Sequence, residues 1–272
     1  TFFLSDRGEL LITELCYSDY YEDPFYQSHV IQPIGHNCIL VGHDPMSQRT
    51  GDHGDYAPGM NDYARIDSFV EGGGLAFASG DLSPVYLGNV RSVKRAVLHI
   101  RPRTALVLDM LETREGETSM DALFHASKIA GVTLDGPGFR IRSGDATLTG
   151  TVVYPSNPSL RLDPDPIVLA NYTNAPMTPP GRITVTSPST GGRAMTATLL
   201  STDLRRRHTT PSADGSVIEL EDALIVVNRG NGSSGDNRLS TDGFLAAAAE
   251  DGSILMAGGT ICMMNGRRVF TS

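Results

Sequence analysis

Residues 90–112, VRSVKRAVLHIRPRTALVLDMLE, carry the pattern that decides the fold class. Two runs rich in β-branched and aliphatic residues, 90–100 and 104–112, are separated only by Arg101, Pro102 and Arg103. A connection this short joins antiparallel strands in a hairpin, whereas parallel strands need a crossover of a dozen or more residues. The stretch therefore predicts two neighbouring antiparallel strands.

The strand pattern recurs along the whole chain, with segments spaced roughly every 8–12 residues, as is typical of sandwiches and barrels. No window longer than about ten residues has the apolar spacing of an amphipathic helix. We therefore predict an all-β fold, a large antiparallel β-sandwich. The strands are expected near 2–4, 9–15, 37–42, 64–70, 74–79, 90–100, 104–112, 119–127, 138–142, 147–154, 182–187, 194–201, 216–220, 223–228, 244–249, 253–257 and 260–270.

Turn residues separate several of these segments and predict hairpins, because they tolerate positive φ. The turns are Asp6-Arg7-Gly8, Glu71-Gly72-Gly73-Gly74, Asp251-Gly252 and Asn265-Gly266. Prolines instead interrupt residues 154–188, and we expect most of that stretch to be a long excursion over the sheet surface. It suggests a division into a large sandwich at 1–200 and a smaller C-terminal β-sheet region at 201–272.

Composition limits the functions that this chain can have. Its 272 residues carry a formal net charge of −9 at a pI near 5.2, which gives no general attraction for nucleic acid. No apolar run approaches the ~20 residues that a membrane span requires, so we predict none. Three widely spaced cysteines form no C-x-x-C pair; Cys38 and Cys262 are expected in the core, with a disulfide left open.

Tyrosines, acids and histidines are concentrated between Glu14 and His36. Such a loop suits sugar binding, because tyrosine offers an apolar face to a sugar ring and a hydroxyl to its polar edge. On composition alone, the same tyrosines could equally cover the core.

The order of residues through this segment resembles the heparinase II/III-like polysaccharide lyases. GELLITE at 8–14 is an apolar strand ending in an acid, the tyrosine loop follows, and GHNCILVGHDPMSQ at 35–48 opens with His-Asn and ends at a glutamine. The resemblance continues through 77–86, 93–100 and an acid at Asp109, and covers about the first 130 residues. It implies a β-sandwich behind a toroid of helices, with eliminative cleavage of uronic-acid polysaccharides in the cleft between them.

The family's toroid is missing from this sequence, and its His-x-His-x-Asp-like motif would fall before Thr1. We therefore expect the carboxy-terminal portion of a longer enzyme, inactive without the helical domain of the same protein. The expected substrate is an acidic polysaccharide or oligosaccharide. The family suggests a periplasmic or extracellular location, although residues 1–7 do not look like a signal peptide.

Carried over position by position, the family's zinc-binding acid falls on Glu14, where most members have Asp, and its zinc-binding histidine falls on His36. Both are ordinary zinc ligands, but two rarely suffice, so the resemblance implies at most an incomplete zinc site. His29, His43 and His53 are the other histidines near enough in sequence to be considered.

The resemblance also implies a catalytic tyrosine in the loop, with Tyr26 as the first candidate and Tyr21 as the second. Asn37, Gln48 and Tyr20 are the predicted substrate-binding residues. Asn37 and Gln48 could instead satisfy backbone groups at strand ends. His125 is interpreted as a core histidine, and cationic groups for an acidic substrate could come from Arg49, Arg65, Arg91 and Arg95.

Two other classes of function stay open from the residues alone. One is a non-catalytic carbohydrate-binding or structural β-sandwich module in which the tyrosine loop stacks on sugar. The other is a protein-interaction module with an exposed aromatic surface. The resemblance favours the lyase over both.

Overall fold

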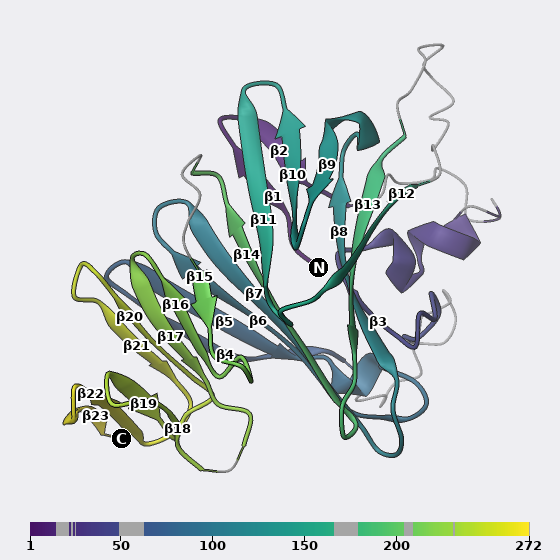
Figure 1. Ribbon diagram of the computed structural model, residues 1–272. Coiled ribbons are helices and arrows are strands. Elements are labelled where there is room, and N and C mark those ends of the chain that lie inside the picture. Colours follow the sequence, from purple (N-terminus) through teal and green to yellow (C-terminus); the bar gives the residue numbers. More distant parts are fainter. Residues whose placement is uncertain are drawn as a thin grey trace.

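The computed structural model describes residues 1–14, 22, 24, 26–48, 63–165, 179–203, 209–230 and 232–271. Within these residues the chain forms layered antiparallel sheets (Figure 1), which confirms the all-β prediction. The helical elements are short: the π-helix η1 (Tyr26–Val30) and the 3-10 helices η2 (Pro33–Gly35), η3 (Ser83–Val85) and η4 (Ile129–Gly131).

The largest layer is an eight-stranded sheet in the order β4-β5-β6-β7-β14-β11-β10-β9. The predicted hairpin at 90–112 lies inside it, as β6 paired with β7 from Val90↔Thr113 to Ile100↔Thr104. The strands are β4 (Arg65–Gly72), β5 (Leu75–Asp81), β6 (Val90–Ile100), β7 (Thr104–Thr113), β9 (Val132–Asp135), β10 (Gly138–Ser143), β11 (Ala146–Tyr154) and β14 (Arg193–Ser201).

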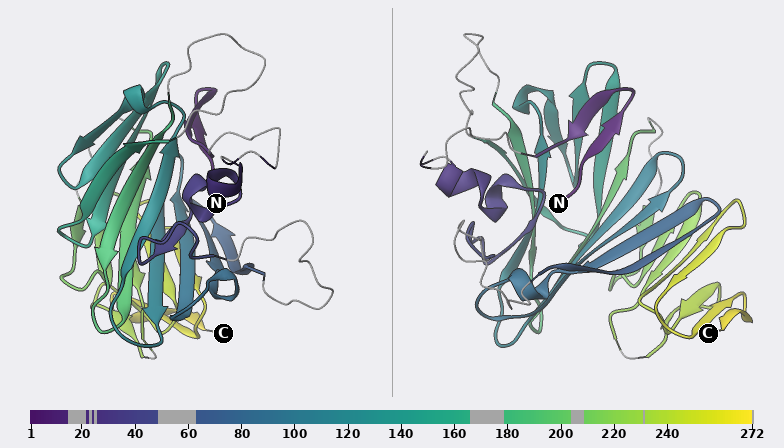
Figure 2. Two further views of the ribbon diagram at one scale, coloured as in Figure 1. Left: turned by 90° about the vertical axis from the view of Figure 1, so that its right-hand side faces the viewer. Right: turned by 180° about the vertical axis from the view of Figure 1, so that it is seen from behind.

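One face of this sheet is covered by a four-stranded sheet in the order β12-β13-β8-β3. Its strands are β3 (Ile39–Val41), β8 (Ser119–Ala126), β12 (Ser159–Pro164) and β13 (Gly181–Pro188). The N-terminal hairpin, β1 (Leu4–Asp6) and β2 (Glu9–Ile12), lies at one end of this sandwich, where β2 contacts β8, β10 and β11 (Figure 2).

Two C-terminal sheets follow. A five-stranded sheet has the order β15-β16-β17-β20-β21, and a four-stranded sheet has the order β18-β19-β22-β23. Whether residues 201–272 fold as a separate unit stays a prediction. The strands are β15 (Thr209–Pro211), β16 (Val217–Leu220), β17 (Ala223–Val227), β18 (Ser234–Gly235), β19 (Leu239–Thr241), β20 (Leu245–Ala249), β21 (Ile254–Ala257), β22 (Ile261–Met264) and β23 (Arg267–Thr271).

Strand β7, in the middle of the eight-stranded sheet, is covered on both faces, and this explains why its sequence does not alternate between apolar and polar residues. Leu106 and Leu108 pack into a core shared with the five-stranded sheet, whereas Val107 packs into the core shared with the four-stranded sheet. A strand covered on both faces reads as a continuous apolar run. The side chains at 95 and 109 share the face of Val107, and this places them beneath the segment that carries the candidate site.

The hairpin predictions are confirmed at all four turns. The residues with positive φ are Arg7 and Gly8 between β1 and β2, Gly73 between β4 and β5, Gly252 between β20 and β21, and Asn265 with Gly266 between β22 and β23. The last turn corrects the expectation of one strand at 260–270, because it divides that stretch into β22 and β23.

The expected excursion over 154–188 is wrong for residues 159–164. These form β12, an edge strand that follows Pro158 and ends at Pro164, where a missing amide hydrogen costs no internal sheet bond. Residues 166–178 of the same stretch lie outside the described residues.

Cys38 and Cys262 are both free thiols, and Cys262 is fully buried, as expected for a core side chain. Cys16 lies outside the described residues. In the part of the chain that the structure describes, no helix is long and apolar enough to cross a membrane.

Candidate functional site

Glu14 and His36 meet where β2 ends and η2 ends. Thr13 forms an isolated bridge with His125, and this fixes the direction in which the chain leaves β2. The Glu14 carboxylate contacts Nδ1 of His36, and Nε2 of His36 lies 2.9 Å from the Val30 carbonyl oxygen at the end of η1. Both partners of the imidazole are acceptors, so the arrangement is fully satisfied when both ring nitrogens carry hydrogen.

The Glu14–His36 pair is only partly buried, because the two side chains are 15% and 35% exposed. Beneath it the polar residues are enclosed. The pair is thus the solvent-facing end of a polar network that continues into the sandwich.

Asn37 is the centre of this network and is fully buried. Its amide nitrogen donates to the carbonyl oxygens of Thr13 (2.6 Å) and Phe2 (2.8 Å), and its amide oxygen accepts from the backbone N–H of His125 (2.7 Å). Its side chain therefore links the residues before β1, the residues that follow β2, and β8. These bonds occupy both the nitrogen and the oxygen of the Asn37 side-chain amide. A substrate-binding role for Asn37 stays a prediction.

Arg95 and Asp109 form the next layer, on neighbouring strands β6 and β7. Two bonds join them, Nε to Oδ1 at 2.6 Å and Nη2 to Oδ2 at 2.9 Å, with side chains only 9% and 1% exposed. The third guanidinium nitrogen donates to the Asn37 carbonyl oxygen. The ion pair thus supports Asn37 from below, and Arg95 is not available as a surface cation.

A second branch joins His125 to Asp165 and Arg182. His125 Nε2 lies 3.0 Å from the Ile34 carbonyl oxygen and 3.4 Å from Asp165 Oδ2, while Arg182 contacts Asp165 Oδ1 at 2.5 Å. Burial lowers the pKa of His125 to about 4. Burial also raises the pKa of Asp165 to about 7, against the opposing effect of the Arg182 guanidinium.

The structure describes only some of the other predicted site residues. Tyr26 is half-buried and begins η1, the helix whose Val30 carbonyl holds His36. The Gln48 amide nitrogen donates to the Tyr86 hydroxyl at 2.7 Å, and that hydroxyl donates to the Ile39 carbonyl oxygen at 2.7 Å. Tyr20 and Tyr21 lie outside the described residues.

The histidines considered as further zinc ligands do not join Glu14 and His36 in any group that the structure describes. His43 bonds Asp121 instead, through Nδ1 at 2.7 Å. His29 bonds the Ser28 hydroxyl at 2.7 Å, and burial together with the Arg182 charge lowers its pKa. His53 lies outside the described residues.

The described residues do not fit a complete zinc site. A carboxylate and an imidazole are suitable donors, but structural zinc takes four ligands and catalytic zinc takes three from protein. No group of three His, Cys, Asp or Glu side chains able to hold a metal occurs within the described ranges. We therefore assign no chemical step to a metal here.

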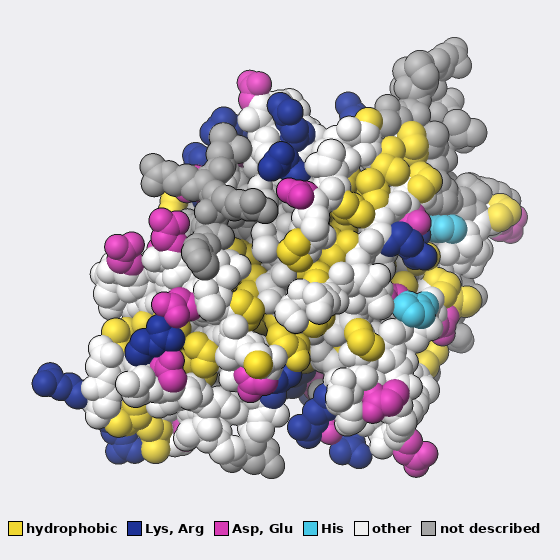
Figure 3. Space-filling view, viewed as in Figure 1, with side chains coloured by type: hydrophobic (Ala, Val, Ile, Leu, Met, Phe, Trp, Pro, Cys, Tyr) yellow, Lys and Arg dark blue, Asp and Glu magenta, His cyan; other side chains and the backbone are white. Residues whose placement is uncertain are grey.

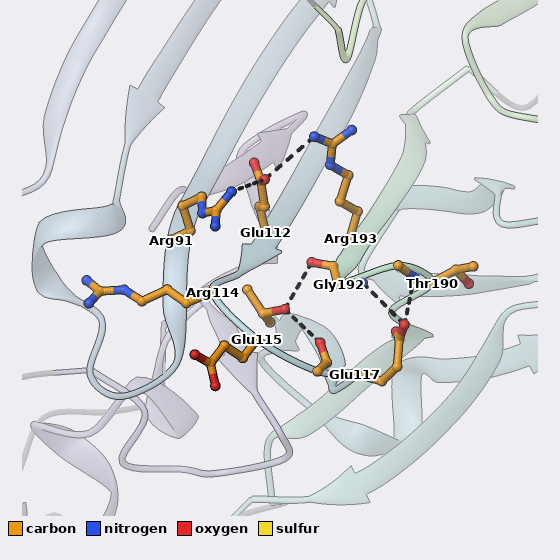
Figure 4. Close-up of a pocket in the computed structure, with 11 residues that line it drawn as sticks. Arg91, Glu112, Arg114, Glu115, Glu117, Thr190, Gly192 and Arg193 are labelled. Carbon is orange, nitrogen blue, oxygen red and sulfur yellow. Dashed lines mark hydrogen bonds and ion pairs between the residues drawn. The ribbon is translucent and has the colours of Figure 1, made fainter.

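Two surface cavities among the described residues lie away from this network. One of about 640 Å³ is lined by the end of β7, the start of β14 and the turns beside them (Figure 4). In it Arg91 and Arg193 converge on Glu112, at 3.2 and 3.6 Å. A neighbouring hollow of about 860 Å³ shares Glu112 and Arg193 and contains none of the predicted site residues. On the face shown in Figure 3, basic and acidic side chains are interspersed rather than gathered by sign.

Asp165 and Arg182 are the members of the network that the sequence analysis missed. Both lie in the proline-interrupted stretch at 154–188. Arg182 begins the strand expected at 182–187, but no local signal pairs that strand with β8 opposite His125. Asp163, which contacts Arg182 at 3.5 Å, was missed for the same reason.

Comparison with solved structures identifies proteins of similar fold. Heparan sulfate lyase HepC from Pedobacter heparinus superposes with a TM-score of 0.59 and 13% identity, over 95% of this chain and 36% of that chain. Two heparinase III structures give TM-scores of 0.60 and 0.56 at 11% identity, over 94% and 93% of this chain and 35% and 34% of theirs. The fold resembles the β-domain of heparinase III.

No family model and no curated protein sequence matches the chain. The chain spans about a third of the length of the heparinase III-like structures. At this identity the likeness establishes the fold alone.

Proposed function

We propose that this chain is the β-domain of a polysaccharide lyase that cleaves a uronic-acid-containing polysaccharide by β-elimination. The observation that carries the proposal is the Glu14–His36 contact beside the helix that begins at Tyr26, in a fold similar to that of heparan sulfate lyases. Residues 14–36 supply the carboxylate, imidazole and phenol groups that the proposal uses.

Elimination at a uronic acid needs a base for the C5 proton, a donor that neutralises the carboxylate and an acid for the departing O4. In our proposal Tyr26 provides one of these proton transfers. His36 acts as a positioning residue, because its Nε2 bond to Val30 fixes the end of the Tyr26 helix. The Glu14 carboxylate and the buried Asn37 layer in turn fix His36.

The remaining groups are proposed to come from a helical domain of the same protein. The chain covers 36% of HepC, so two thirds of that lyase has no counterpart here. Two of the four arginines considered as cations for an acidic substrate are already paired, because Arg95 is buried on Asp109 and Arg91 pairs with Glu112. Arg65 is exposed at the start of β4, and Arg49 lies outside the described residues.

The experiment is a lyase assay on the longer protein, following the ultraviolet absorbance of the unsaturated uronate product. Tyr26→Phe should lower kcat by roughly 100-fold, the usual contribution of a positioned acid or base. Tyr63→Phe is the matched control, because Tyr63 is a 56% exposed tyrosine on a different segment, and it should leave turnover unchanged.

Two results would contradict the proposal. Unchanged turnover in Tyr26→Phe would remove this tyrosine from the chemistry. Binding of the polymer by the longer protein without any absorbance change would favour the non-catalytic carbohydrate-binding module.

A further inference from the structure

A tight turn after β3 aims an exposed histidine back over β8. Gly42 and His43 both have positive φ, at 67° and 61°, and Val41 and Asp44 close the turn as an isolated bridge. A non-glycine residue in this conformation is uncommon, although histidine tolerates it better than most. The His43 side chain is 65% exposed, so its imidazole is held at the surface rather than in the core.

The imidazole of His43 bonds two side chains of β8. Its Nδ1 lies 2.7 Å from Asp121 Oδ2, and its Nε2 lies 3.0 Å from the Ser119 hydroxyl. Ser119 and Asp121 alternate with core residues along β8, so both project from the same face of the strand. The topology thus places a hydroxyl, an imidazole and a carboxylate in one line.

The carboxylate at the end of this line is buried and fixed. The Asp121 side chain is 3% exposed, and its other oxygen accepts from the Thr186 hydroxyl on β13 at 2.6 Å. Since an ionised carboxylate only accepts, the hydrogen of a neutral His43 lies on Nδ1, and Nε2 is left to accept from Ser119. This is the tautomer that a general base for a serine nucleophile requires.

We propose that Ser119, His43 and Asp121 form a nucleophilic site that takes the acyl group of small carboxylic esters. The Ser119 oxygen bonds the ester carbonyl carbon while His43 Nε2 takes the hydroxyl proton. The carbon–oxygen bond to the alcohol then breaks, and that proton passes to the leaving oxygen. Water next attacks the acyl carbon and gives a proton to His43. The bond between the acyl carbon and the Ser119 oxygen breaks, that proton passes to the Ser119 oxygen, and a carboxylic acid is released.

This site is distinct from the proposed lyase site. Ser119 and Asp121 interact with His43 and Thr186, whereas Glu14 and His36 interact with Val30 and Asn37. The proposal therefore stands whether or not the longer protein is a lyase.

The test is to treat the chain with a fluorophosphonate and locate the adduct by peptide mass, with p-nitrophenyl acetate hydrolysis as the second readout. The expected result is one adduct, on Ser119, that Ser119→Ala abolishes. His43→Gln and Asp121→Asn should each lower the rate of labelling and of ester hydrolysis by roughly 100-fold. Ser28→Ala is the matched control, because Ser28 also bonds a histidine, and it should leave both rates unchanged.

His43→Gln keeps the test valid if Asp121→Asn fails to fold, because His43 is exposed and its loss leaves the core intact; circular dichroism checks this. No adduct on Ser119 above that on other serines would overturn the proposal. Equal labelling of wild type and a folded His43→Gln would also overturn it, since the histidine would then not activate the serine.

Discussion

At the scale of single residues, the Arg95–Asp109 pair is the most sensitive point of the network. Asp109→Asn would leave a guanidinium buried without its counter-charge, and breaking a buried pair typically costs about 3–5 kcal/mol. We expect that loss in the free energy of unfolding, measured by urea denaturation. Glu112→Gln is the control on an exposed pair and should cost about 1 kcal/mol or less. Equal costs for the two substitutions would show that Arg95 finds another partner.

The pH dependence of stability should reveal Asp165 and His125, whose contributions have opposite signs. The folded pKa of Asp165, about 7, is above its ordinary 3.8, so its protonation stabilises the fold as the pH falls through that range. The folded pKa of His125, about 4, is below its ordinary 6.5, so the fold loses stability as the pH falls from 6.5 towards 4. In the wild type the two contributions offset each other.

Asp165→Asn removes the stabilising contribution and keeps the destabilising one. On acidification from pH 7 to 4 this variant should therefore lose about 3 kcal/mol more unfolding free energy than the wild type. Urea denaturation at several pH values provides the measurement, and the other titrating groups are common to both proteins. Parallel pH profiles would mean that Asp165 is ionised throughout, held so by Arg182.

At the scale of elements, β10 and β11 approach closely at Gly150. Gly150 lies opposite Phe139, and a Cβ at Gly150 would come within 2.2 Å of the Phe139 ring. Phe139 is 2% exposed and packs on Phe124 at 5.5 Å between ring centroids, so it has no room to move. Gly150→Ala should therefore destabilise the fold by about 1–3 kcal/mol, as overpacking of a core does.

Two comparisons of unfolding free energies test whether the clash with the Phe139 ring causes this loss. Gly72→Ala, at a strand glycine where an added Cβ would meet nothing within 4 Å, should change stability by less than about 0.5 kcal/mol. In a Phe139→Leu background, Gly150→Ala should cost less than in the wild type. A cost independent of residue 139 would place the effect in the backbone of β11 instead.

Most long strands and all four hairpin turns could be predicted, because their signals are local. Val90–Ile100 and Thr104–Thr113 follow from β-branched and aliphatic runs beside a short connection, and Asn265-Gly266 follows from residues that tolerate positive φ. The short strands β9, β12, β15, β18 and β19 were missed, since a strand of a few residues carries little pattern. All of them except β19 lie at a sheet edge. Strand order was also beyond the sequence, because β7 pairs with β14 across long-range contacts that no local signal fixes.

At the scale of the whole molecule, the sequence predicted only those site residues that the order of motifs along the chain identifies. Glu14 and His36 were singled out by their place in the segment, and the structure brings their side chains into contact. The supporting layers could not be predicted, because their members are distant from Glu14 and His36 in sequence: Arg95 lies on β6, Asp109 on β7, Arg182 on β13, and Asp165 directly after β12. Those layers explain how a partly exposed pair at the sandwich edge is held in place.

We propose that this chain carries one side of a lyase active site and needs a helical domain to complete it. The measurement is the ultraviolet absorbance of unsaturated uronate, with a uronic-acid polymer incubated with this chain alone and with a protein that adds the upstream region. Our account predicts no product from the chain alone and accumulation with the longer protein, because catalysis requires base, acid and carboxylate-neutralising groups held together around the sugar. Product formation by the chain alone, unchanged in Tyr21→Phe and Tyr26→Phe, would contradict it.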